Sequence, residues 1–71
     1  MTYYRGRYGA QYAAEHEGRY VIVDSHGNLT QSGNATLRFC RDLTRVRMKY
    51  VPIDLLPKLR AHLKTNHEHQ N

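Results

Sequence analysis

The stretch RYVIVDSHGNLTQS, residues 19–32, decides the fold, because it has the pattern of two strands joined by a turn. Its first part, RYVIVD, has the β-branched content that is typical of a strand. The middle part, SHGN, can turn because Gly27 and Asn28 both tolerate positive φ, and LTQS can return as a second strand. The sequence therefore predicts a β-hairpin.

A second stretch, TRVRMKYVP at residues 44–52, alternates basic and less polar side chains. Strict alternation has the period of two that is typical of a strand, whereas a helix would scatter the same cations around its circumference. We therefore expect a third strand, which Pro52 ends because proline offers no donor to the ladder. The side chains expected in the core are Val46, Met48 and Tyr50, and the cations expected on the outer face are Arg45, Arg47 and Lys49.

Three segments have the pattern of helices. Four leucines within residues 55–63 form a continuous apolar stripe at helical spacing. A shorter helix is expected over ATLRFCRDL, residues 35–43, because Asn34 is a good N-cap. We expect a third helix at about residues 10–17, with Gly18 as its C-terminal stop.

In chain order these elements read (α)ββαβα, where the bracketed helix is the one at residues 10–17. This order predicts an α+β fold, in which a small antiparallel three-stranded sheet has two or three helices packed on one face. All 71 residues are expected to form one domain. Its parts would be a flexible Tyr/Arg-rich arm at about residues 1–9, a folded body at about 10–65, and a frayed polar tail at 66–71.

The small size of the chain favours a homodimer. A domain of this length buries only about 60% of the surface that its unfolded chain exposes, so its stability is marginal. The single cysteine, Cys40, excludes an intrachain disulfide, and its apolar neighbours place it in the core.

Four apolar residues have no assured place in a core of this size, and we expect a two-fold dimer to bury them, with Leu56 or Phe39 near its axis. The expected core is Val21, Val23, Leu37, Cys40, Leu43, Val46, Met48, Leu55, Leu59 and Leu63, and the four remaining residues are Ile22, Phe39, Ile53 and Leu56.

The positive charge of the chain is confined to its second half. Residues 1–35 carry three cations and three anions, so residues 36–71, with eight cations and three anions, hold the whole net charge of +5. A local excess of this kind favours a polyanionic partner through attraction and counterion release. The N-terminal arm also interleaves tyrosines with arginines, and single-stranded nucleic acid stacks on such groups.

These patterns predict a small basic binding module, without enzymatic activity or a cofactor, that contacts nucleic-acid phosphates. The candidate site residues are Arg45, Arg47, Lys49, Arg38, Arg41, Arg5, Arg7, Tyr3 and Tyr4. The alternative is a protein-interaction module, such as a small inhibitor or accessory factor of phage or mobile-element type, whose basic face docks on an acidic protein surface. With no apolar run of about 18 residues and no signal-peptide pattern, we expect a cytoplasmic protein without a membrane partner.

Two sharper hypotheses rest on histidine. Asp24, Ser25 and His26 contain the residue types of a hydrolytic triad, which would make a small His-assisted ribonuclease the third candidate. Adjacent side chains diverge in a turn, however, and turn chemistry explains these residues without catalysis. A zinc site would draw on His62, His67 and His69 with Cys40 or His16, but their spacing fits no standard finger, so we expect no metal.

Overall fold

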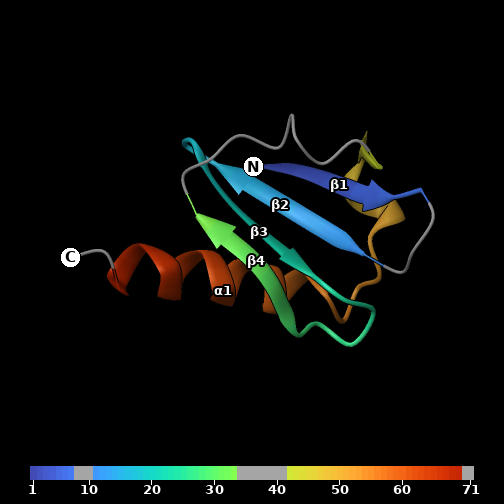
Figure 1. Cartoon of the computed structure of the whole chain (residues 1–71). Coiled ribbons are helices and arrows are strands. Elements are labelled where there is room, and N and C mark those ends of the chain that lie inside the picture. Colours follow the sequence, from blue (N-terminus) through green and yellow to red (C-terminus); the bar gives the residue numbers. More distant parts are fainter. Residues whose placement is uncertain (8–10, 34–41, 70–71) are drawn as a thin grey trace.

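The computed structural model describes residues 1–7, 11–33 and 42–69, and for residues 65–69 it describes the course of the backbone alone. Five strands and one α-helix make up this part of the chain (Figure 1). The elements are β1 (Thr2–Gly6), β2 (Tyr12–His16), β3 (Arg19–Val23), β4 (Leu29–Gly33), β5 (Leu43–Val46), a 3₁₀ helix (Met48–Tyr50) and α1 (Leu56–His69).

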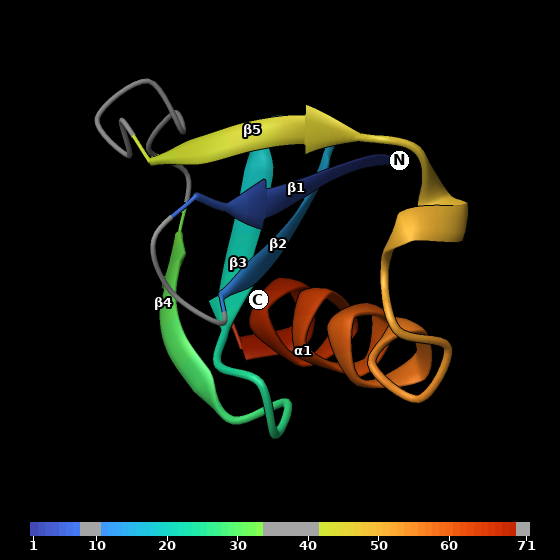
Figure 2. The ribbon, with the colours of Figure 1, turned by 90° about the vertical axis from the view of Figure 1, so that its right-hand side faces the viewer.

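The strands form one antiparallel sheet in the order β4-β3-β2-β1-β5, and α1 packs against one of its faces (Figure 2). The predicted three-stranded sheet with two or three helices is therefore wrong. Two of the five strands, β1 and β2, come from residues where the sequence predicted a flexible arm and a helix.

Strand β2 replaces the helix expected at residues 10–17. Glu17 and Gly18 both have positive φ, 52° and 83°, as the tight turn of a two-residue hairpin requires. This turn pairs His16 with Arg19, so Gly18 ends a strand rather than a helix. Ala13 faces one side of the sheet and Ala14 the other, and both are fully buried. Tertiary pairing thus overrides the helical preference of alanine.

Strand β1 gives the N-terminal segment a fixed place between β2 and β5. Thr2 pairs with Glu15 of β2, and Tyr3 pairs with Val46 of β5. The Tyr3 side chain is only 6% exposed and belongs to the core beneath the sheet. The segment expected as an adaptable arm is therefore a central part of the sheet.

The predicted hairpin at residues 19–32 is confirmed as β3 and β4. Its turn is built around Asp24, whose Oδ1 accepts hydrogen bonds from the backbone N–H groups of His26 and Asn28, both at 2.9 Å. Gly27, at φ 87°, takes the left-handed position of the turn. A bulge interrupts the ladder near Val23, and the Thr30 hydroxyl donates to the Ile22 carbonyl oxygen at 2.9 Å beside it.

The third predicted strand is half correct. β5 covers Leu43–Val46, but the chain then turns into the 3₁₀ helix Met48–Tyr50, closed by a hydrogen bond from the Tyr50 N–H to the Arg47 carbonyl oxygen at 2.9 Å. The register explains this end, because Val46 already lies opposite Tyr3 and β1 begins one residue earlier. Beyond that point the chain has no neighbouring strand to continue the ladder.

The main core lies between α1 and the sheet. The leucine stripe of the predicted helix is confirmed, since Leu55, Leu59 and Leu63 are buried against the sheet. On the sheet side these leucines meet buried residues of β1, β2 and β3, namely Tyr3, Ala14, Val21 and Val23. The helix continues to His69, into the segment expected to fray.

The opposite face of the sheet also buries side chains. Ala13, Tyr20 and Ile22 form a second buried cluster there, with Tyr4 and Leu43 packed against it. Ile22 therefore has a place in the monomer, contrary to expectation. The helix predicted at residues 35–43 falls mostly outside the described residues, and its last residue, Leu43, begins β5.

Candidate functional site

The cations of residues 45–50, called here the cationic segment, lie at one edge of the sheet and just beyond it. Arg45 belongs to β5, Arg47 follows that strand, and Lys49 lies in the 3₁₀ helix. All three side chains are exposed, and the structure gives none of them an ion pair with a described carboxylate. Their charge is therefore open to a partner.

The same segment exposes apolar groups that were expected in the core. Because the 3₁₀ helix breaks the alternation after Val46, Met48 is 49% exposed and Tyr50 is 56% exposed. The Lys49 Nζ atom lies 5.2 Å from the centroid of the Tyr50 ring, which is cation–π distance. Ile53, 84% exposed, follows shortly afterwards. The surface thus combines cations, one aromatic ring and aliphatic groups.

Sequence reasoning missed Tyr50 as a candidate site residue. Its position in the alternating pattern assigned it to the buried face together with Val46 and Met48. The strand ends early because of where β1 begins, and that register is a tertiary property. No local signal in residues 44–52 marks the break.

The four residues of the N-terminal segment that were predicted as site residues differ in how far they are exposed. Tyr3 is in the core, so its ring is not offered to a partner. Tyr4 is half-buried, and its hydroxyl donates to Glu15 Oε1 at 3.1 Å. Arg5 and Arg7 have exposed side chains. The backbone N–H of Arg7 donates to the Asp42 carbonyl oxygen at 2.7 Å. Arg38 and Arg41 lie outside the described residues.

Electrostatics connect Tyr4 with the cationic segment. Burial raises the pKa of Tyr4 above its ordinary value, and the hydrogen bond to Glu15 and the charge of Glu15 act in the same direction. Arg45, which lies directly opposite Tyr4 in the sheet, acts in the opposite direction and lowers this pKa. The Tyr4 phenol therefore remains protonated at neutral pH and serves as a hydrogen-bond donor on this face.

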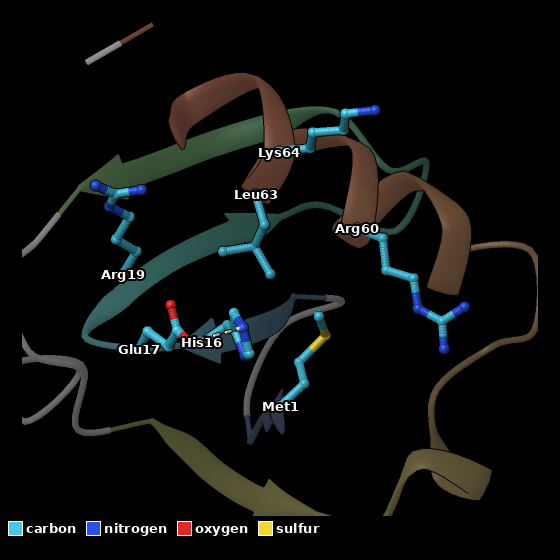
Figure 3. Close-up of a pocket in the computed structure, with 7 residues that line it drawn as sticks. All are labelled: Met1, His16, Glu17, Arg19, Arg60, Leu63 and Lys64. Carbon is cyan, nitrogen blue, oxygen red and sulfur yellow. Dashed lines mark ion pairs between the residues drawn. The ribbon is translucent and has the colours of Figure 1, made fainter. Parts of the chain in front are cut away.

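A pocket lies between α1 and the turn that joins β2 to β3, with a volume of about 440 Å³. Leu63 and Met1 extend toward its middle from opposite sides (Figure 3). Arg19, Arg60 and Lys64 stand at its margins, and His16 and Glu17 form an ion pair at 3.6 Å beside them. Sequence reasoning did not single out this pocket, because its residues come from three separate parts of the chain.

The described contacts of the turn that contains His26 are structural hydrogen bonds. Asp24 Oδ1 is occupied by the two turn amides, and the Lys58 ammonium donates to the His26 carbonyl oxygen at 2.9 Å. His62, once considered as a zinc ligand, donates from Nε2 to the Gly27 carbonyl oxygen at 3.0 Å. This histidine and Lys58 thus hold the β3–β4 turn against α1.

Two further features concern metals and membranes. Within residues 1–7, 11–33 and 42–64, whose side chains are described, no three His, Cys, Asp or Glu residues are grouped as metal ligands would be. Neither helix in the described part of the chain is both long and apolar enough to cross a membrane.

The chain matches no protein-family model, no curated protein and no solved structure.

Proposed function

We propose that this protein is a non-enzymatic binding module for single-stranded nucleic acid, with the cationic segment as its contact surface. The observation that carries the proposal is the exposed Tyr50 ring with Lys49 beside it, in one segment with Arg45 and Arg47; none of the three cations has an ion pair with a described carboxylate. Cations neutralise phosphates and release counterions, and exposed aromatic rings offer a stacking platform to unpaired bases.

The arrangement of these groups favours a single strand over a duplex. A base can stack on Tyr50 only when it is not stacked inside a helix, and such bases occur in single strands and loops. The contact surface is also a short 3₁₀ helix at the end of a strand rather than a long α-helix that could enter a major groove. Sequence preference is expected to be weak, because stacking and phosphate contacts tolerate any base.

A fluorescence-anisotropy titration with a labelled oligonucleotide of mixed sequence tests the proposal. Tyr50→Ala should weaken binding by about 1–3 kcal/mol, the usual contribution of one stacked base. Tyr50→Phe keeps the ring and should bind like the wild type. Since Tyr50 is exposed, both variants should melt like the wild type. Equal affinity of wild type and Tyr50→Ala would contradict stacking on this ring.

A second candidate, docking on an acidic protein surface, is favoured by the exposed aliphatic groups Met48 and Ile53. Aliphatic contacts are common at the centres of protein interfaces, and neighbouring cations would then meet carboxylates at the rim. Ile53→Ser distinguishes the two functions. It should weaken a protein complex and leave the affinity for a single strand unchanged.

A further inference from the structure

The pocket between α1 and the β2–β3 turn has the mixed character of a site for an organic anion. Leu63, 8% exposed, forms an apolar wall, and the Met1 side chain faces it (Figure 3). Arg19 and Arg60 supply cations at its margins, while Lys64 lines the pocket with its ammonium group extending away from Leu63; the one lining carboxylate, Glu17, is directed to His16. Its volume of about 440 Å³ lies in the range of small-molecule sites, about 300–1,000 Å³.

The separation of the cations narrows the class of ligand. The guanidinium groups of Arg19 and Arg60 lie at opposite margins of the pocket in Figure 3, with the apolar side chains between them. A ligand that uses this arrangement has an apolar body over Leu63 and Met1 and an anionic group that reaches one margin. A nucleotide fits this description, because its base is planar and largely apolar on its faces while its phosphate accepts charge-assisted hydrogen bonds.

The sheet register places this pocket at the same end of the molecule as the cationic segment. Val46 pairs with Tyr3, Thr2 with Glu15, and His16 with Arg19. The starts of β1 and β3 therefore lie at the same end of the sheet as the ends of β2 and β5. Arg47 follows β5 at that end, and Arg19 begins β3 three strands away. With strands about 4.8 Å apart, their backbones are separated by about 14 Å.

We propose that this pocket binds one nucleotide, either as a free mononucleotide or as the terminal nucleotide of a strand held by the cationic segment. This inference rests on the proposed function for the choice of a nucleotide among organic anions. The base lies against Leu63 and Met1, and the phosphate is bound at the margin by Arg19, Arg60 or Lys64. The strand then continues toward Arg47 and Tyr50.

A nuclear magnetic resonance titration of the ¹⁵N-labelled chain with AMP tests this site directly. AMP at millimolar concentration should shift the amides of residues 16–19 and 63–64. At least one of Arg19→Ala, Arg60→Ala and Lys64→Ala should weaken AMP about 10- to 150-fold, the size of one lost charge-assisted contact. Arg5→Ala removes the same charge outside the pocket and should leave the affinity unchanged. Adenosine and inorganic phosphate, which each supply half of the ligand, should both bind more weakly than AMP.

The outcomes separate this inference from the proposed function. If an oligonucleotide shifts residues 47–50 while AMP shifts nothing in the pocket, the pocket proposal is refuted and strand binding stands. If AMP shifts the pocket but no oligonucleotide binds, the strand-binding function fails and the pocket is a site for free mononucleotides. A loss from Arg5→Ala as large as the largest loss among the three pocket variants would also overturn the pocket, because it would show attraction by net charge alone.

A competition arm identifies the source of the nucleotide. An oligonucleotide with a terminal phosphate should displace AMP if the pocket holds the end of a strand. Simultaneous binding of AMP and the oligonucleotide assigns the pocket to a free nucleotide instead.

Discussion

Replacement of Gly27 by alanine should destabilise the domain through the contact between the β3–β4 turn and α1. Gly27 has φ 87°, and a left-handed conformation costs a residue with a side chain about 1–2 kcal/mol. An added Cβ would also overlap Lys58 Cδ and approach Leu55 Cδ2 to 3.3 Å. Lys58 must then move and lose its hydrogen bond to the His26 carbonyl oxygen, which adds about 0.5–1.5 kcal/mol.

The expected total for Gly27→Ala is about 1.5–3.5 kcal/mol, which corresponds to a melting temperature lowered by about 6–28 °C for a domain of this size. Gly18→Ala is the matched control, because Gly18 has a similar φ of 83° and nothing within 4 Å of its added Cβ. It should cost only the conformational part, about 1–2 kcal/mol. Both values come from thermal or urea unfolding followed by circular dichroism.

A double-mutant cycle with Lys58→Ala isolates the docking contact. When Lys58 is already truncated, Gly27→Ala should cost only slightly more than Gly18→Ala, because the approach to Leu55 Cδ2 is the one close contact of the added Cβ that remains. If Gly27→Ala and Gly18→Ala are equally destabilising in the unmodified chain, the turn is not held against α1 and this reasoning is refuted.

Three further predictions concern the strand end, the core and the turn. Val46→Asp should unfold the domain because Val46 packs against the core, whereas Met48→Asp should leave the melting curve almost unchanged; a folded Val46→Asp variant would contradict the register. Leu59→Ala should lower the free energy of unfolding by about 2–5 kcal/mol in urea, since Leu59 is 0% exposed; a negligible loss would remove it from the core. The Asn28 backbone N–H, with that of His26, holds the pKa of Asp24 below its ordinary value of 3.8. Wild type should therefore be more stable than Asp24→Asn at neutral pH, and acid melts should show this advantage lost as the pH falls through the Asp24 pKa; a constant difference would contradict the charge effect.

The parts of the fold that local sequence encodes were predictable. Turn chemistry at Asp24 and Gly27 marks the β3–β4 hairpin, and the leucines of residues 55–63 mark the buried face of α1. Strands β1 and β2 carry no comparable signal, because Tyr, Gly and Ala residues in short runs become strands only through their neighbours. Their identity depends on pairing with β3 and β5, which lie far apart in the sequence.

The sequence predicted that the cations of the candidate site are exposed, but it predicted neither the exposed apolar groups among them nor the pocket. The alternating cations at residues 45–49 are exposed as expected, since either a strand or a 3₁₀ helix leaves long basic side chains in solvent. The exposure of Met48 and Tyr50 follows instead from the point where β1 begins. The pocket at Leu63 needs three segments of the chain to come together, which no local pattern encodes.

The homodimer stays a prediction, but two of the four apolar residues that motivated it have places within the monomer. Ile22 is buried in the second cluster, and Leu56 packs against the main core of the monomer. Phe39 lies outside the described residues. Of the four residues that motivated a dimer, Ile53 is the one that the described structure leaves largely exposed, and it follows the cationic segment in the chain.

The salt dependence of oligonucleotide binding tests the central claim most directly. Three phosphate contacts by Arg45, Arg47 and Lys49 predict that log K falls with log salt at a slope of about −2, since each contact on a single strand contributes about −0.7. Arg47→Ala should reduce the slope by about 0.7 without changing the melting temperature. Arg5→Ala, which removes an exposed charge outside both the cationic segment and the pocket, is the matched control and should leave the slope unchanged. Binding that ignores salt, or a slope unchanged by Arg47→Ala, would contradict a nucleic-acid site at this segment.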